Sequence, residues 1–323
     1  MGLLSSVNCH LGLLLRSQEN NSIENQPRSG RRLIAHSPSG EMSIREHCIV
    51  TSELLPYLDR EDDDSENAKN LVNPDHVLSK FPFHCPVLRG TEQVVDEDGD
   101  LVLDRRENAI LIEHGKSTTL NEVGLQVWRG ALLLADWVIH NTKLLSQATV
   151  LELGSGTGLT SIAAALVAAE VISTDADIGN ILALIDSNFK RNQSLVKCPY
   201  KVLELDFFAQ EWSNELEEVI DRTNIVIAAD VIYDDDLTEA FVSTLKRLLS
   251  KPPSKSIYMA LEKRFVFTLE DLDSVAPCFE HFLRCIAKPD FPWKMETVDC
   301  DFPQYFKYER TKELALWKIS SLI

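Results

Sequence analysis

The stretch Leu151-Glu152-Leu153-Gly154-Ser155-Gly156-Thr157-Gly158 decides the fold of this 323-residue chain. It joins a short apolar run that starts at Thr149 to a run with helical spacing that starts at Leu159. Three glycines within five residues allow a tight turn, and a helix that follows such a turn begins with free N–H groups. We therefore expect a ligand to bind where this strand passes into this helix.

Short apolar runs alternate with longer helical runs along the rest of the chain, and this pattern predicts an α/β fold. We expect a Rossmann-like, doubly wound sheet of seven strands with helices on both faces. The expected strands are 149–153, 170–174, 200–205, 224–230, 256–261, 294–298 and 314–319, and the expected helices are 122–140, 159–169, 178–192, 236–249 and 270–284. No helix separates the last two strands, which predicts an antiparallel edge.

The first third of the chain has a different character. Residues 18–32 are polar, and residues 61–67 form an acidic run of a kind that is usually solvated. We expect a largely disordered acidic arm over 1–90, an extension with a β-hairpin and a strand over 91–120, and the main domain over 121–323. The hairpin is indicated by an Asp-Gly turn between two apolar runs. A calcium loop is the alternative, but Leu101 stands where such a loop requires glycine.

Composition restricts the partners. The 32 basic and 50 acidic residues give a net charge of −18, which repels nucleic acid and suits a basic partner, although it also simply favours solubility. No apolar run is long enough to span a bilayer. The 7 cysteines include no C-x-x-C pair, so we expect neither a metal site nor a disulfide framework. The start of the chain matches a myristoylation pattern at Gly2, a short pattern that often matches by chance.

The glycine spacing indicates which cofactor binds. A dinucleotide fingerprint requires a third glycine where Leu159 stands. A carboxylate at Glu152 repels a pyrophosphate and attracts an ammonium or sulfonium group. Asp175 ends the next strand, where it can bind ribose hydroxyls. We therefore expect S-adenosylmethionine, which has both cationic groups and no phosphate. If the glycines stood alone, a purely structural turn would be the better interpretation. Their agreement with Glu152, Asp175 and the fold pattern favours a cofactor site.

Three motifs, in this order, resemble those of the seven-β-strand protein-lysine methyltransferases. Residues 151–158 look like motif I of that family, Leu125-Gln126-Val127-Trp128-Arg129-Gly130-Ala131 is similar to the tryptophan motif before it, and Ala229-Asp230-Val231-Ile232-Tyr233 is similar to the D-x-x-Y motif after the fourth strand. The resemblance covers about residue 94 to the C-terminus. It implies a class I methyltransferase fold and methylation of a protein lysine. It further implies a basic, nuclear, nucleic-acid-binding zinc-finger substrate of the Kin17 type.

The resemblance also implies the residues that bind the cofactor. These are Trp128, Gly154, Ser155, Gly156, Asp175 and Ala229, to which we add Glu152, Asp206 and Phe207. The family usually has a tryptophan where Phe207 stands. Phenylalanine can still pack on an adenine face, but it lacks the indole N–H.

Asp230 and Tyr233 are the candidate catalytic residues. A lysine must react as a neutral amine, although its free pKa is about 10.4. Asp230 can hold the cationic lysine as it docks, and the Tyr233 hydroxyl can orient the neutral amine. Without the family pattern, a strand-end or helix-start carboxylate and a packing aromatic are the better explanations of these two residues. Beyond them, residues 262–264 follow the fifth strand toward the substrate side.

Other functions stay open at this point. The fold also suits a methyltransferase of a small molecule or of nucleic acid, or a non-catalytic scaffold, while the glycine spacing disfavours an oxidoreductase. We expect a monomer in the nucleus or cytoplasm, without direct contact to nucleic acid or membrane. Asp234-Asp235-Asp236 places three further charges beside the D-x-x-Y motif. One of them is expected to cap the following helix, and the others to attract a basic segment.

Overall fold

The computed structural model describes residues 49–57, 59–60, 71–84, 108–268, 273–287 and 292–321. The hairpin expected at residues 93–103, its calcium-loop alternative and Gly2 lie outside these residues.

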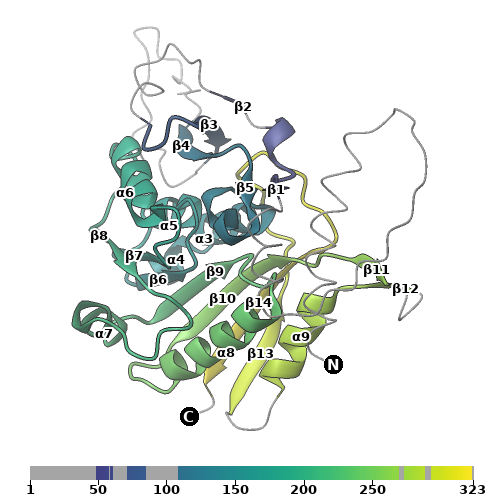
Figure 1. Ribbon diagram of the computed structural model, residues 1–323. Coiled ribbons are helices and arrows are strands. Elements are labelled where there is room, and N and C mark those ends of the chain that lie inside the picture. Colours follow the sequence, from purple (N-terminus) through teal and green to yellow (C-terminus); the bar gives the residue numbers. More distant parts are fainter. Residues whose placement is uncertain are drawn as a thin grey trace, which may run out of the picture.

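A seven-stranded sheet forms the centre of the molecule (Figure 1). Its order is β13-β14-β10-β9-β6-β7-β8, and the order reverses between β6 and β9. The strands are β6 (Thr149–Leu153), β7 (Glu170–Asp175), β8 (Tyr200–Glu204), β9 (Ile225–Ala229), β10 (Ser256–Glu262), β13 (Trp293–Val298) and β14 (Leu314–Ser321). The first five run parallel, and β14 is antiparallel to both of its neighbours. The expected fold and its antiparallel edge are confirmed.

Helices cover both faces of this sheet, because alternate side chains of each strand point to opposite sides. Val150 belongs to the core under α3 (Arg129–His140), α5 (Leu159–Ala164) and α6 (Ile181–Arg191). Leu151 and Leu153 belong to the core under α7 (Asn214–Ile220), α8 (Asp235–Leu249) and α9 (Pro277–Ile286). The short α4 (Thr142–Leu145) follows α3. Within the described ranges, no helix is long and apolar enough to cross a bilayer.

Part of the region expected to be a largely disordered arm, residues 1–90, forms ordered strands. Strand β3 (His76–Phe83) pairs with β2 (Asp59–Arg60) and, over eight residues, with β4 (Asn108–Gly115). Phe81 and Phe83 are buried with Ile110 and Ile112 of β4. The partner of β3 lies about thirty residues further along the chain, and local sequence windows do not contain it.

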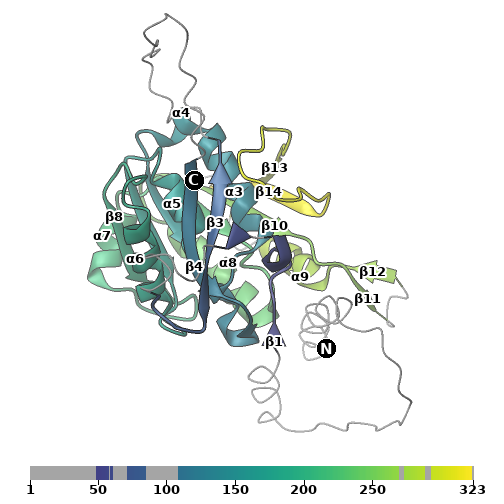
Figure 2. The same ribbon diagram turned by 90° about the horizontal axis from the view of Figure 1, so that it is seen from above.

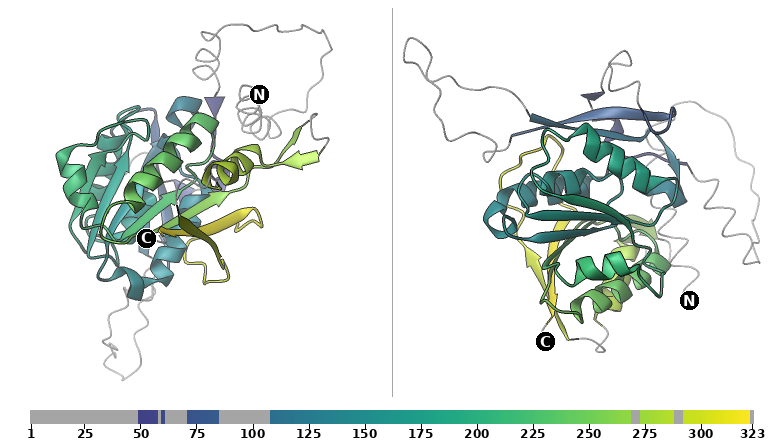
Figure 3. Two further views of the ribbon diagram at one scale, coloured as in Figure 1. Left: turned by 90° about the horizontal axis from the view of Figure 1, so that it is seen from below. Right: turned by 90° about the vertical axis from the view of Figure 1, so that its left-hand side faces the viewer.

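Two asparagine carboxamides, one within α6 and one at its C-cap, attach β4 to the main domain. Asn188 exchanges hydrogen bonds of 2.8 and 3.0 Å with the backbone of Glu113, and Asn192 exchanges bonds of 2.9 and 2.7 Å with that of Leu111. Four residues of helix advance about 6 Å, which is close to two residues of strand. The two asparagines therefore act on β4 as a neighbouring strand would. The right-hand view of Figure 3 shows β3 and β4, in blue, lying over the teal α6.

Segment 49–57 lies against the domain beside the tryptophan motif. Strand β1 (Ile49–Val50) pairs with β5 (Thr118–Thr119), and the 3₁₀ helix η1 (Leu55–Tyr57) follows. Gln126 donates hydrogen bonds to the Val50 carbonyl (2.9 Å) and to the Thr118 hydroxyl (2.8 Å). The backbone at Gln126 is extended, with φ −114° and ψ 163°.

The extended backbone at Gln126 explains why the helix expected over 122–140 was wrong. The structure has the 3₁₀ helix η4 (Leu120–Leu125) instead, and α3 then begins at Arg129 with Trp128 as its N-cap residue. The helix expected over 270–284 also starts later, at Pro277, because proline suits the first turn of a helix. A hairpin of β11 (Val266–Thr268) and β12 (Asp273–Val275) precedes it and extends away from the sheet (Figure 2).

Candidate functional site

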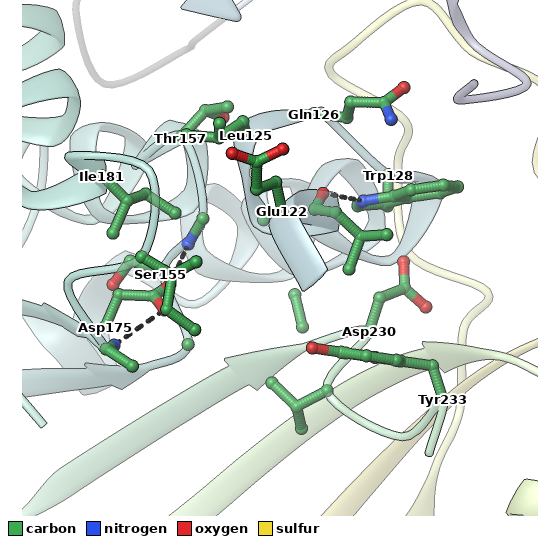
Figure 4. A pocket seen from close by; sticks show the side chains of 18 of the residues that line it. Glu122, Leu125, Gln126, Trp128, Ser155, Thr157, Asp175, Ile181, Asp230 and Tyr233 are labelled. Carbon is green, nitrogen blue, oxygen red and sulfur yellow. Dashed lines mark hydrogen bonds between the residues drawn. The ribbon is translucent and has the colours of Figure 1, made fainter. Parts of the chain in front are cut away.

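A cavity of about 340 Å³ lies at the carboxyl ends of the parallel strands, where the strand order reverses (Figure 4). Ligands of doubly wound sheets bind at this position. Every candidate residue from the sequence lines the cavity: Trp128, Glu152, Gly154, Ser155, Gly156, Asp175, Asp206, Phe207, Ala229, Asp230 and Tyr233. The structure thus brings together residues from η4, α3 and the ends of four strands.

The glycine turn forms the floor of the cavity and has no room for side chains. Gly154 and Gly156 have φ of 64° and 55°, a left-handed conformation that favours glycine. A Cβ on Gly156 would stand 2.9 Å from the carbonyl oxygen of Gly124, and one on Gly154 would stand 2.8 Å from Val231. Ser155 fixes the turn to β7, since its amide donates to the Thr174 carbonyl (2.9 Å) and its hydroxyl accepts from the Thr174 amide (3.0 Å).

Asp175 connects the glycine turn to the end of β7. Its Oδ2 accepts a hydrogen bond from the Gly156 amide (2.8 Å), and its Oδ1 accepts from the Ala176 amide (2.9 Å). Burial raises the pKa of this carboxyl to about 6. Each carboxylate oxygen has a second lone pair, so Asp175 can accept hydrogen bonds from a pair of ligand hydroxyls while it holds the turn.

Glu152 is buried beneath the turn and is not the fixed negative charge expected from the sequence. Burial raises its pKa to about 8, and the Ser161 hydroxyl donates a hydrogen bond to its carboxyl group. The group therefore keeps its proton at pH 7 in the ligand-free protein. A cation that enters the cavity stabilises the ionised form and lowers this pKa.

The loop after β8 supplies an apolar wall. The Phe207 ring packs on Phe241 with centroids 5.3 Å apart, and its Cζ lies 3.7 Å from the position of a Cβ on Gly154. Asp206 holds the loop, since its Oδ1 accepts from the Phe208 amide at 2.9 Å. Ile178 and Phe208 also line this end and are half exposed. This end suits a flat, apolar ring system.

Asp230 joins three elements at the other end of the cavity. Its Oδ2 accepts from the Gly130 amide in the first turn of α3 (2.6 Å), and its Oδ1 accepts from the Glu262 amide at the end of β10 (2.9 Å). Its φ is 51°, a rare value for a residue other than glycine. Burial raises its pKa against the nearby charge of Arg264. Asp230 therefore has a structural role in addition to the role in binding lysine expected from the sequence.

Trp128 and Tyr233 line the same end. The Trp128 indole donates to the Val123 carbonyl (2.9 Å), and the Arg264 guanidinium lies 4.8 Å from its ring centroid. Tyr233 packs with Trp128 against Val50 and Val123, and Figure 4 shows its hydroxyl directed into the cavity. Ala229, at the end of β9, completes this wall.

A cluster of charged residues adjoins this wall: Arg264 lines the cavity, and Glu53, Arg129 and Glu262 lie next to it. Sequence reasoning did not identify Glu53 or the role of Arg129. Arg129 contacts Glu262 at 3.0 Å and Glu53 at 3.8 Å, and Arg264 contacts Glu53 at 3.9 Å. Burial and the charge of Glu53 raise the pKa of Glu262 to about 7. Burial opposes the ionisation of Glu53, but Arg264, a hydrogen bond with Glu262 and Arg129 together lower its pKa.

Glu53 reaches this cluster because Ser52 is bonded to the tryptophan motif. The Ser52 amide donates to Gln126 Oε1, and its hydroxyl donates to the Val127 carbonyl, both at 2.5 Å. Glu53 and Gln126 are separated by more than seventy residues, and no sequence signal connects them. Beside the cavity, Asp234 accepts from the Leu237 amide (3.0 Å) and caps α8, which confirms that one residue of this acidic stretch caps the helix.

Comparisons with known proteins agree with this geometry. A family model described as lysine methyltransferase matches residues 107–275. Methyltransferase-like protein 22 of Mus musculus is 39% identical over 252 residues, covering 70% of this chain and 64% of that protein. The Homo sapiens protein of the same name is 39% identical over 231 residues, covering 65% and 57%. Protein-lysine N-methyltransferase EEF2KMT of Bos taurus is 23% identical over 236 residues, covering 66% and 64%. The chain thus spans somewhat less than two thirds of these relatives.

Proposed function

Because the chain belongs to the lysine methyltransferase family, we propose that it is a protein-lysine N-methyltransferase that uses S-adenosylmethionine. The observation that carries this proposal is that residues of all three sequence motifs line one and the same cavity. Its two ends differ in chemistry: one is apolar beside the glycine turn, and the other is polar and aromatic beside β9. A cofactor bound at the first end can present its reactive group to a substrate that enters at the second.

The residues at the glycine turn fit this cofactor. Gly154 and Gly156 hold the turn in left-handed conformations with no room for a Cβ, so the backbone itself lines the cavity. Asp175 has lone pairs for the ribose hydroxyls, Phe207 offers a face for the adenine, and the buried acid of Glu152 becomes a counter-charge when a cation approaches. When bound, the cofactor supplies a methyl group activated on a sulfonium sulfur.

The residues around Asp230 prepare the lysine amine. Trp128 and Tyr233 form aromatic walls that favour a narrow aliphatic side chain, and the Asp230 carboxylate favours the ammonium form during docking. The lysine releases one proton to water before reaction. The Tyr233 hydroxyl oxygen then accepts an N–H of the neutral amine, which directs the nitrogen lone pair along the line of displacement. Such alignment lowers a barrier by several kcal/mol, up to about 7 or more.

The net charge of −18 and the acidic start of α8 support a basic protein substrate, since complementary charge raises the rate of encounter. We propose a nuclear, nucleic-acid-binding zinc-finger protein of the Kin17 type as the substrate class. The enzyme acts as a monomer in the nucleus or cytoplasm and contacts the protein rather than its nucleic acid.

The test combines cofactor binding with methyl transfer. The purified chain is titrated with S-adenosylmethionine in a calorimeter, then incubated with methyl-labelled cofactor and either nuclear extract or a purified basic zinc-finger protein. We expect label on protein lysine, loss of binding and label in Gly154→Arg, and label reduced at least tenfold with unchanged cofactor affinity in Tyr233→Phe. Cofactor binding without transfer to any protein overturns the proposal in favour of a non-catalytic scaffold. Label in nucleic acid or small molecules favours the other class of methyltransferase.

A further inference from the structure

Helices α8 and α9 pack against each other on the face of the sheet to which Leu151 and Leu153 point (Figure 1). Three potential metal ligands meet between these two helices. Glu239 lies on α8, and His281 and Cys285 lie on α9. Residues four apart on a helix share a face, so both α9 side chains point toward the same partner helix. The thiol of Cys285 is buried, His281 is partly buried and Glu239 is exposed.

Two of the three distances among these atoms match those of a tetrahedral metal site. His281 Nε2 lies 3.3 Å from Cys285 Sγ and 3.4 Å from Glu239 Oε1, and all three ligand atoms lie within 4.8 Å of one another. Zinc bonds of about 2.0 Å to nitrogen, 2.3 Å to sulfur and 2.0–2.2 Å to oxygen place neighbouring ligand atoms roughly 3.3–3.5 Å apart. Two of the three separations already have this value, and the exposed Glu239 side chain can rotate to reach the third.

The same three groups can also interact by ordinary hydrogen bonds. A ring N–H at Nε2 can donate to the Glu239 carboxylate or to the Cys285 sulfur, whereas the other tautomer leaves a lone pair at Nε2 that a metal ion can use. A divalent cation between the three groups interacts with all of them at once, because a lone pair, a thiolate and a carboxylate all face it. Binding at this set displaces the thiol proton and any proton on Nε2.

We propose that Glu239, His281 and Cys285 form a Zn²⁺ site that joins α8 to α9. Mixed nitrogen, sulfur and oxygen ligands favour zinc over the hard cations magnesium and calcium. The fourth position is left to water. The sequence predicted no metal site because it has no C-x-x-C pair. That criterion misses this set, in which a histidine and a cysteine lie four residues apart on one helix and a glutamate comes from another.

The site is placed to influence the cavity without belonging to it. Glu239 follows Leu237, a residue of the cavity wall, by only two positions, and α8 begins directly after the D-x-x-Y motif. A metal ion at Glu239 therefore restrains the helix that carries this part of the wall. The proposal does not rest on the enzymatic function: zinc binding is measured on the protein alone.

The experiment is a zinc competition on the full chain. Protein treated with chelator and exchanged into metal-free buffer is titrated into a zinc complex of a chromogenic chelator. We expect one zinc ion per chain to be withdrawn, and the midpoint of thermal unfolding to rise with zinc. Cobalt in place of zinc gives a thiolate-to-metal charge-transfer band in the near ultraviolet.

Matched variants identify the ligands. Cys285→Ser and His281→Ala should lose the withdrawn zinc and the cobalt band. Cys198→Ser and Cys300→Ser, which alter cysteines away from this cluster, should keep both. Because Cys285 is buried, the exposed Glu239→Gln is the variant that leaves packing intact, and its zinc affinity should fall at least tenfold. Wild-type protein that withdraws no zinc, or a Glu239→Gln or Cys285→Ser variant with wild-type affinity, overturns the proposal.

Discussion

Replacement of Asp230 by alanine should destabilise the whole domain, in addition to any effect on methyl transfer. The carboxylate accepts from the Gly130 amide at 2.6 Å and from the Glu262 amide at 2.9 Å. Alanine removes both acceptors and leaves two backbone donors without partners at the junction of α3, β9 and β10. Alanine also keeps the left-handed φ of 51°, which an aspartate tolerates better because its side chain bonds locally.

The expected magnitude follows from these two bonds. A buried backbone donor without its acceptor costs about 1–3 kcal/mol, so the loss of two gives roughly 2–6 kcal/mol. Burial of the Asp230 carboxylate is itself unfavourable, as its raised pKa indicates. Its removal therefore offsets part of this cost. We expect a net loss of about 3 kcal/mol, and a midpoint of thermal unfolding lower by roughly 6–12 °C in a domain of this size. Asp230→Asn, which keeps one acceptor oxygen, should lose about half as much.

Thermal and urea unfolding followed by circular dichroism measure this loss. Asp236→Asn is the matched control, because Asp236 is exposed on the same side of the cavity, and its stability should stay within about 0.5 kcal/mol of wild type. An Asp230→Ala protein that unfolds within about 1 kcal/mol of wild type would refute the structural role. Methyl transfer by Asp230 variants is then meaningful only at temperatures at which they remain folded.

Three further outcomes test the cavity. The stability that Glu152 contributes should be fully present below about pH 4.5 and be lost as the pH rises through about 8, because its folded pKa lies above its unfolded value. In Glu152→Gln, the free energy of unfolding in urea should vary less with pH over this range. A pH dependence identical to that of wild type argues against burial as the cause of the raised pKa. Gly156→Ala, whose Cβ would stand 2.9 Å from a backbone carbonyl oxygen, should weaken S-adenosylmethionine binding at least tenfold by calorimetry. Phe207→Ala should weaken the same binding about tenfold, since an aromatic stack contributes about 1–3 kcal/mol, whereas Phe207→Trp should retain it. Equal affinities of wild type, Phe207→Ala and Phe207→Trp for the cofactor would exclude a stack of this ring on the adenine.

The residues of the cavity were predictable because a parallel sheet gathers the ends of its strands at one edge. Asp175, Phe207 and Asp230 are far apart in the chain, yet each follows a strand that the alternation of apolar runs identifies. The ranges of the sheet strands were predictable from the same alternation, whereas the helices expected over 122–140 and 270–284 begin later in the structure. Glycine spacing added the shape of the turn, because Gly154 and Gly156 adopt backbone angles that other residues avoid.

The protonation of Glu152, the partners of Asp230 and the entry of Glu53 into the site were decided only by the tertiary structure. Burial raises the pKa of Glu152 to about 8, and burial results from the packing of α5 and β6 rather than from the residues beside it in the chain. Asp230 reaches amides of two elements that lie 100 and 32 residues away.

The N-terminal region shows the same division. Strand β3 forms because β4 pairs with it, and Glu53 joins Arg129 and Arg264 because Ser52 is bonded to the tryptophan motif. The sequence by itself determined the fold class, the glycine turn and which strand ends line the cavity, since these follow from local periodicity and backbone preference. Charge state, hydrogen-bond partners and the contribution of distant segments depend on contacts between residues far apart in the chain, and these exist only once the chain has folded.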